Sequence, residues 1–152
     1  MDLIHYQLAQ LNIAQFRKPK DHPDNADFVA NIDRVNAIAE SQAGFVWRLV
    51  GVGNDATDIQ AFDDPNILIN LSVWKDIESL AAFAYRNSAH KEIMRRRQEW
   101  FDEMEFYLVL WWVEEGHIPT LVEAKERLNL LATNGPTEKA FTFKKSFLPA
   151  KV

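Results

Sequence analysis

The chain has 152 residues, an apolar fraction of 47% and a net charge of −5. A chain of this length folds as a single domain with a sizeable core, for which five Trp and ten Phe supply large side chains. Basic residues are scattered apart from the run Arg95 to Arg97, so nucleic acid is not expected as a partner. The lack of cysteine excludes disulfides, thiolate nucleophiles and cysteine-ligated metals.

The N-terminal residues contain no basic segment followed by an apolar one, which is the pattern of a secretory signal. No apolar run approaches the ~18 residues that a membrane span requires. We therefore expect no membrane association and a soluble protein of the cytoplasm.

The first third of the chain predicts two strands with a helix between them. Residues 4–13 are rich in β-prone side chains, and residues 44–52 form a second apolar run that ends at Gly53. Asp24 or Asn25 caps a helix that begins at Ala26 and stops at Gly44. Its apolar residues recur at helical spacing: Phe28, Ile32, Val35, Ile38 and Ala39.

Residues 53–65 form an acidic connection with four aspartates. Their spacing matches no calcium-binding loop, because the glycine and the terminal glutamate of that template are absent. The segment is interpreted as a solvated loop.

The stretch from Leu68 to Trp112 organises the rest of the chain. It predicts a strand at 68–74, a helix at 76–85, a break at Arg86 and Asn87, a second helix at 88–104 and an apolar strand at 106–113. After this stretch we expect a helix at 121–132, a small edge strand at 140–143 and loose residues after Leu148.

The order β-α-β-β-α-β predicts a ferredoxin-like α+β fold with its second helix broken and a further helix appended. We expect a single domain over 1–143 and a loose tail over 144–152. The strand at 106–113 is apolar on both faces, so both faces of the sheet require cover. Since helices were expected on one face only, the sequence predicts a homodimer in which a second sheet covers the other.

One helical stripe carries the candidate chemistry. Offsets of 0, 3, 4, 7, 11 and 14 from His90 place an inward-facing set on one side of the helix: His90, Ile93, Met94, Arg97, Phe101 and Met104. An inward histidine can ligate a metal or haem iron, act as a general base, or simply pack in the core, and the residue pattern by itself favours packing. Arg97 requires an acid, either a core residue such as Asp76 or Glu78 or an acidic ligand in a cavity. Aromatic side chains would wall that cavity: Trp74, Phe83, Tyr85, Trp100, Trp111 and Trp112.

Other catalytic motifs are missing from the sequence. The remaining histidines, His5, His22 and His117, lie in separate segments, and no HExxH motif occurs, so a structural zinc site is not expected. Neither a nucleophile elbow nor a glycine-rich phosphate loop is present. Hydrolase, kinase and dinucleotide-binding functions therefore lack support.

Several motifs together carry a resemblance to a known family: FVANIDRVNAIAE, GFVWRL, ATDIQAFDDP, LINLSVW, FAYRNSAHKEIMRRRQEWF, LVLWWV and GHIPT. They resemble the bacterial domain-of-unknown-function family 3291 over almost the whole chain to Phe143. That family is similar to the dimeric α+β-barrel superfamily, which includes antibiotic-biosynthesis and haem-degrading monooxygenases. The resemblance implies a dimeric barrel.

Residues 72–101 are also similar to a segment of spheroidene monooxygenase, a haem-containing carotenoid oxygenase. The similarity puts His90 where a proximal haem ligand would be expected. It also marks Trp74, Phe83, Ala84, Tyr85, Arg97 and Trp100. This chain is much shorter, so a long carotenoid is not the expected substrate.

We therefore predict a monooxygenase-like enzyme that acts on a small molecule, with haem bound through His90 as the cofactor hypothesis. The catalytic candidates are His90, Arg97 and Tyr85, and the cofactor-binding candidates are His90, Arg97, Trp74 and Trp100. Two alternatives stay open: a cofactor-free protein that binds a small aromatic or acidic molecule, and a structural or sensory barrel in which His90 is only packed.

Overall fold

A computed structural model describes residues 4–51, 55–57, 59–104 and 107–149. Five strands form one sheet: β1 (Tyr6–Phe16), β2 (Phe45–Arg48), β3 (Ile67–Trp74), β4 (Phe101–Asp102) and β5 (Leu108–Glu114). The described residues also form four α-helices: α1 (Ala26–Ser41), α2 (Ile77–Ala81), α3 (Ser88–Arg95) and α4 (Leu121–Asn134). Short helical turns occur at Pro23–Asn25, Ala82–Arg86 and Arg97–Glu99.

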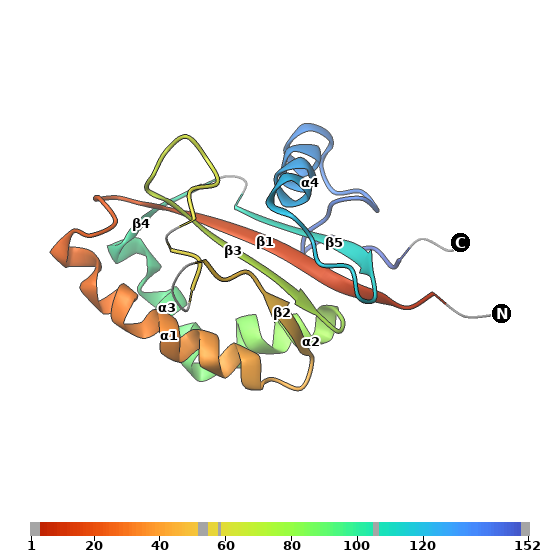
Figure 1. The fold of residues 1–152 in the computed structure, drawn as a ribbon, viewed down its shortest axis with the longest axis horizontal. Coiled ribbons are helices and arrows are strands. Elements are labelled where there is room, and N and C mark those ends of the chain that lie inside the picture. Colours follow the sequence, from red (N-terminus) through yellow and green to blue (C-terminus); the bar gives the residue numbers. More distant parts are fainter. Residues whose placement is uncertain (1–3, 52–54, 58, 105–106, 150–152) are drawn as a thin grey trace.

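The sheet is antiparallel, and β1 is its central strand (Figure 1). β3 pairs with one side of β1 and carries β2 on its outer edge, while β5 and the short β4 pair with the other side. The main order β2-β3-β1-β5 is that of a ferredoxin-like α+β fold, which confirms the predicted fold class.

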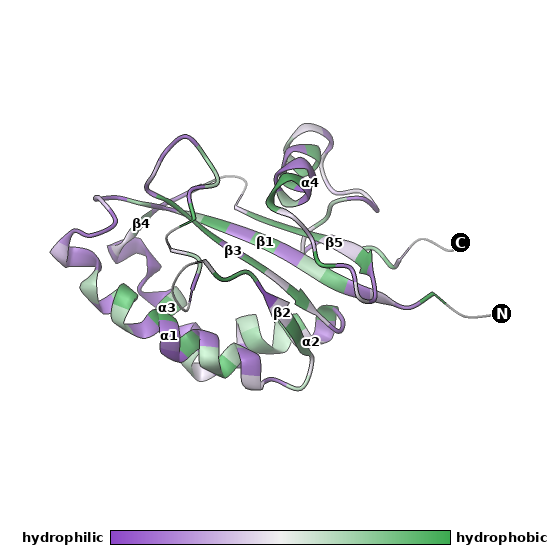
Figure 2. Ribbon diagram, viewed as in Figure 1, coloured by the Kyte–Doolittle hydropathy of each residue, from purple (hydrophilic) through white to green (hydrophobic). Residues whose placement is uncertain are grey.

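Alternation along β1 divides its side chains between the two faces of the sheet. Leu11 and its neighbours two residues away pack against α4, on what we call the α4 face. Leu8 packs with Trp74 and Ala39 on the opposite face, called the α1 face. Figure 1 shows α4 on one side of the sheet and α1, α2 and α3 on the other, and Figure 2 shows hydrophilic and hydrophobic bands alternating along β1.

The expectation that helices would cover only one face of the sheet was wrong. α4 lies on the second face, where Leu128 and Leu131 pack against Leu11 and Trp111. Trp111 has no exposed surface within a single chain. A second copy is therefore not needed to cover this face, and the homodimer remains a prediction that rests on the family resemblance.

The predicted helix at 88–104 is also wrong in its second half, because α3 ends at Arg95. A turn at Arg97–Glu99 follows, and then Phe101 pairs with Phe16 at the end of β1. The backbone N–H of Arg17 donates to the carbonyl of Trp100 over 2.9 Å. Strand pairing and aromatic packing thus override helical spacing at this position, since helix propensity is a weak preference.

The predicted break at Arg86 and Asn87 is confirmed. Asp76 caps α2, which continues into a π-helical turn at Ala82–Arg86. Asn87 then caps α3, because its Oδ1 accepts hydrogen bonds from the backbone N–H groups of Ala89 and His90. The structure therefore has two short helices that meet at a capped junction.

The C-terminal segment packs against the edge strand β5. The predicted strand at 140–143 is present only as one antiparallel bridge between Phe141 and Leu110. Beyond it, the carbonyl of Phe147 accepts a hydrogen bond from Trp112 Nε1 over 2.7 Å. Ordered contacts therefore continue past the expected boundary at residue 143, because aromatic side chains of this segment complete the core of the α1 face.

The remaining boundaries differ from the expectations by a few residues. β1 extends to Phe16, β2 ends at Arg48, and α4 runs to Asn134. The expected strand positions 52 and 106 lie outside the described residues, as do 53, 54 and 58 of the acidic segment. Where that segment is described, Ala56 and Phe62 pack on the α4 face, so it is more than a solvated loop.

Within the described ranges, no helix has the length and apolar character that crossing a membrane requires.

Candidate functional site

His90 is held in place by the junction between α2 and α3. Its Nδ1 lies 2.8 Å from the carbonyl oxygen of Ala84, which belongs to the π-helical turn. Carbonyls in the last turn of a helix lack partners from their own helix, and the imidazole supplies one here. The ring also packs against Phe83, with centroids 4.8 Å apart. The prediction that His90 faces inward is thus confirmed by its contacts.

The environment of His90 favours the neutral imidazole. Burial lowers the pKa of His90 below its ordinary value, and the hydrogen bond to Ala84 opposes that shift only in part. Because a carbonyl oxygen can only accept, Nδ1 must carry the proton and donate it to Ala84. Nε2 is then left with a lone pair, which can accept a proton or bind a metal ion.

A continuous set of contacts leads from His90 to the middle of the sheet. Phe83 stacks on Trp74 with ring centroids 5.5 Å apart, and Trp74 Nε1 donates to Ser72 Oγ over 2.9 Å. Ser72 Oγ also accepts a hydrogen bond from Gln10 Nε2 over 2.7 Å. We call these five residues, Gln10, Ser72, Trp74, Phe83 and His90, the Gln10–His90 row. It places the histidine and the indole in one layer on the α1 face.

Two members of this row, Gln10 and Ser72, were not predicted from the sequence. The side chain of Gln10 is almost fully buried, and its amide bonds to Asn12, Asn70 and Ser72. A signal for it exists in the sequence, since Gln10 and Asn12 are polar residues two positions apart in the predicted strand and therefore share one face. A buried amide with every contact satisfied fixes its neighbours rigidly.

Arg97 does not join His90, which contradicts the predicted inward pair. The α3 helix ends before it, and its side chain lies exposed on the following turn. Of the three adjacent arginines, Arg96 makes the tertiary contacts: it pairs with Asp27 and Glu99 and lies over the ring of Trp100. Arg97 is therefore not placed to engage a ligand beside His90.

Trp100 is buried, but in a different aromatic cluster, with Phe16, Phe28 and Phe101. The register of β1 shows the separation, because Trp74 pairs with Leu8 and Phe101 pairs with Phe16. Eight residues of strand at ~3.3 Å each put these positions on the order of 26 Å apart. Trp74 and Trp100 therefore cannot enclose one planar cofactor.

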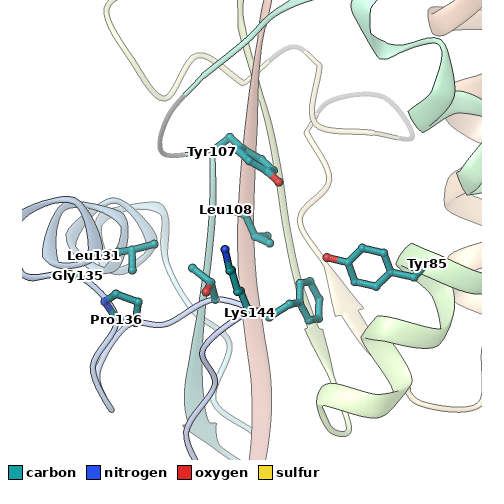
Figure 3. A pocket seen from close by; sticks show the side chains of 9 residues that line it. Tyr85, Tyr107, Leu108, Leu131, Gly135, Pro136 and Lys144 are labelled. Atoms are coloured by element: carbon teal, nitrogen blue, oxygen red, sulfur yellow. The ribbon is translucent and has the colours of Figure 1, made fainter.

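Tyr85 lines a pocket at the edge of β5 that no residue of the Gln10–His90 row lines (Figure 3). The pocket has a volume of about 260 Å³ and receives residues from the π-helical turn, β5, α4 and the C-terminal segment. It is lined by Tyr85, Tyr107, Leu108, Leu131, Gly135, Pro136, Thr142, Phe143 and Lys144. Partial burial, together with the nearby Tyr107, raises the pKa of Tyr85, so its hydroxyl stays protonated at neutral pH.

Among the residues that the structure describes, no three His, Asp or Glu side chains lie close enough together to hold a metal ion. His117 instead lies 2.7 Å from Glu123 at the start of α4. If haem were bound, His90 would be the residue that holds its iron, because the carbonyl of Ala84 orients the ring through Nδ1 and leaves a lone pair on Nε2. Arg97 and Trp100 do not fit the same group, so the predicted haem-binding set is not assembled.

Comparisons with known proteins agree with this fold. A family model described as a domain of unknown function (DUF3291) matches residues 7–152. A conserved protein from Methanosarcina mazei Go1 has a TM-score of 0.51 at 20% identity, over 70% of this chain and 90% of its own. A Shewanella oneidensis protein has a TM-score of 0.50 at 11% identity, over 74% and 95% of the two chains. Identities this low show a shared fold alone.

A third structure, from Nitrosomonas europaea and provisionally assigned as an antibiotic biosynthesis monooxygenase, has a TM-score of 0.47 at 13% identity. The match covers 78% of this chain and 95% of that one. None of the curated proteins compared with the chain matches it.

Proposed function

The chain belongs to the DUF3291 family, and from this premise we propose that it is a monooxygenase-like enzyme in which His90 accepts a proton from a small-molecule substrate. The observation that carries the proposal is the bond from Nδ1 of His90 to the carbonyl of Ala84. It fixes the ring in the tautomer whose Nε2 has a lone pair, which is the form that a general base requires.

The surroundings of His90 support the same role. A base must be unprotonated to act, and burial favours that form of His90 because it lowers the pKa of the ring. The ring of His90 packs on Phe83, which stacks on the buried indole of Trp74, and that indole bonds to Ser72 and through it to Gln10, so the histidine rests on a fixed set of contacts. The likeness of residues 72–101 to spheroidene monooxygenase is the reason for placing oxygen chemistry in the proposal.

The experiment that tests this proposal measures oxygen uptake with a panel of readily oxidised phenols and 1,3-dicarbonyl compounds, whose acidic protons suit a histidine base. His90→Gln should lower turnover by about 100-fold or more, since general bases contribute on that scale. Arg97→Ala should leave turnover unchanged, because Arg97 lies exposed outside the row. Oxygen uptake that survives His90→Gln, or that is missing with the whole panel, would contradict the proposal.

Haem binding through His90 is a second candidate, favoured by the orientation of the ring towards Ala84. Haem would supply the oxygen chemistry itself, while this chain would contribute one nitrogen ligand. Titration of the protein with haemin, followed at the Soret band, tests it. A Soret shift in wild type and in Arg97→Ala, but not in His90→Ala, is the expected result. Identical spectra for wild type and His90→Ala would exclude ligation by His90.

A further inference from the structure

A second site lies at the β5 edge, and we propose that the pocket between Tyr85, Tyr107 and Lys144 binds a small aromatic carboxylate. It is separate from the proton acceptor described above, because His90 is not among the residues that line it. Three features of the pocket match such a ligand: its size, its apolar walls and the charge at its rim.

The walls of the pocket are apolar and come from four different segments. Leu108 lies at the start of β5, Leu131 belongs to α4, Pro136 follows that helix, and Phe143 belongs to the C-terminal segment. A volume of about 260 Å³ is below the roughly 300–1,000 Å³ typical of sites for drug-sized ligands. A molecule with a single aromatic ring therefore fits better than a larger one.

Three polar groups converge on this apolar space. Figure 3 shows the hydroxyls of Tyr85 and Tyr107 and the amine of Lys144 directed towards it. Lys144 forms no ion pair with any residue that the structure describes, although the chain as a whole has a net charge of −5. A cation beside two phenolic donors matches a carboxylate, which accepts hydrogen bonds and carries the opposite charge.

The walls of the pocket are held by contacts that do not depend on a ligand. Tyr85 packs edge-on against Phe143, with ring centroids 5.2 Å apart. The neighbouring Phe141 pairs through its backbone with Leu110 over 2.8 and 2.9 Å. α4 ends at Asn134, and the capping residue Gly135, with a φ of +72°, turns the chain out of the helix. Preformed walls lower the entropy cost of binding.

Exposure of the two tyrosines also points to a ligand. Tyr85 is 57% exposed and Tyr107 is 47% exposed, although both rings lie beside apolar neighbours. Tyrosine is common at binding surfaces because it combines a large apolar ring with a hydrogen-bonding tip. An aromatic ligand would cover both rings and leave its carboxylate near Lys144.

The experiment follows backbone amide shifts by NMR during titration with benzoate, and repeats the titration with benzamide as the uncharged analogue. Benzoate should shift the amides of Tyr85, Tyr107 and Lys144 saturably. Lys144→Met should weaken binding about fivefold, as expected for a partly exposed ion pair. Lys145→Met is the matched control and should bind like wild type, since Lys145 does not line the pocket.

Tyr85→Phe provides an independent variant, because it removes one donor and keeps the ring; it should weaken benzoate binding about two- to tenfold. His90→Gln should bind benzoate normally, which separates this site from the proposed oxygen chemistry. Equal binding of benzoate and benzamide would overturn the proposal. So would unchanged affinity in Lys144→Met, or saturating benzoate that shifts none of the three amides.

Discussion

Trp111 donates a hydrogen bond from its indole nitrogen to Oε2 of Glu123 over 2.8 Å, which ties the buried centre of β5 to the first turn of α4. The other carboxylate oxygen lies 2.7 Å from Nε2 of His117. Thr120 caps the same helix by accepting from the backbone N–H of Glu123. One glutamate thus joins the sheet, the helix and the preceding turn, on the face where a second copy had been expected.

Replacing Glu123 with alanine should destabilise the fold by about 1–3 kcal/mol, because the N–H of a fully buried indole would lose its acceptor. Glu123→Gln should cost less, since its amide oxygen can still accept from Trp111. Urea unfolding followed by tryptophan fluorescence measures both changes. Glu126→Ala, an exposed position on the same helix, is the control. A Glu123→Ala variant no less stable than this control would show that the bond is dispensable.

Gly44 is the second position where one substitution gives a clear expectation. A Cβ added there would collide with both Oγ and Cβ of Ser79. Gly44→Ala should therefore destabilise the protein by about 1–3 kcal/mol, the usual cost of overpacking. Thermal unfolding measures the change. The double variant Gly44→Ala with Ser79→Gly should recover part of the loss, whereas strictly additive effects would show that the two residues do not collide.

His90 should make stability depend on pH. Burial lowers its pKa in the folded protein below the ordinary value of 6.5. As the pH falls through 6.5, the unfolded chain takes up a proton that the folded chain resists, so the free energy of unfolding decreases. Urea midpoints measured between pH 8 and pH 5 should fall less steeply for His90→Gln than for wild type. Parallel slopes for the two proteins would rule out a buried, neutral His90.

The sequence predicted the parts of the fold that local pattern determines. The helix after Thr120 and the break at Asn87 are encoded by caps and helical spacing within a few residues. The end of α3 at Arg95 is not, because Phe101 leaves the helix to pair with Phe16, 85 positions earlier. The spacing of residues along a helix cannot predict a pairing with a strand so far away in the sequence.

In the candidate site, too, the sequence predicted only what local pattern determines. His90 turned inward as its place on α3 indicated, since capping by Asn87 fixes the first turn. The prediction that Arg97 faces inward was wrong, because it required the helix to continue past Arg95. Gln10 and the pocket at Lys144 depend on which strands and segments meet in three dimensions, and no spacing along the chain shows that.

Trp112 gives a last prediction, about the C-terminal segment. Its indole N–H donates a hydrogen bond to the carbonyl of Phe147. Lys144 and Lys145, which lie just before Phe147 in the sequence, are exposed. Trp112→Phe removes the donor and keeps an aromatic ring, so the segment should open more often. Losing one neutral hydrogen bond, worth about 0.5–1.5 kcal/mol, corresponds to about two- to tenfold faster trypsin cleavage after these lysines. Trp47→Phe, a change in β2 at the opposite edge of the sheet, is the control and should not alter the cleavage rate. If both variants are cleaved at the wild-type rate, the bond to Phe147 does not hold the segment, which is the result expected for the loose tail predicted from residue 144.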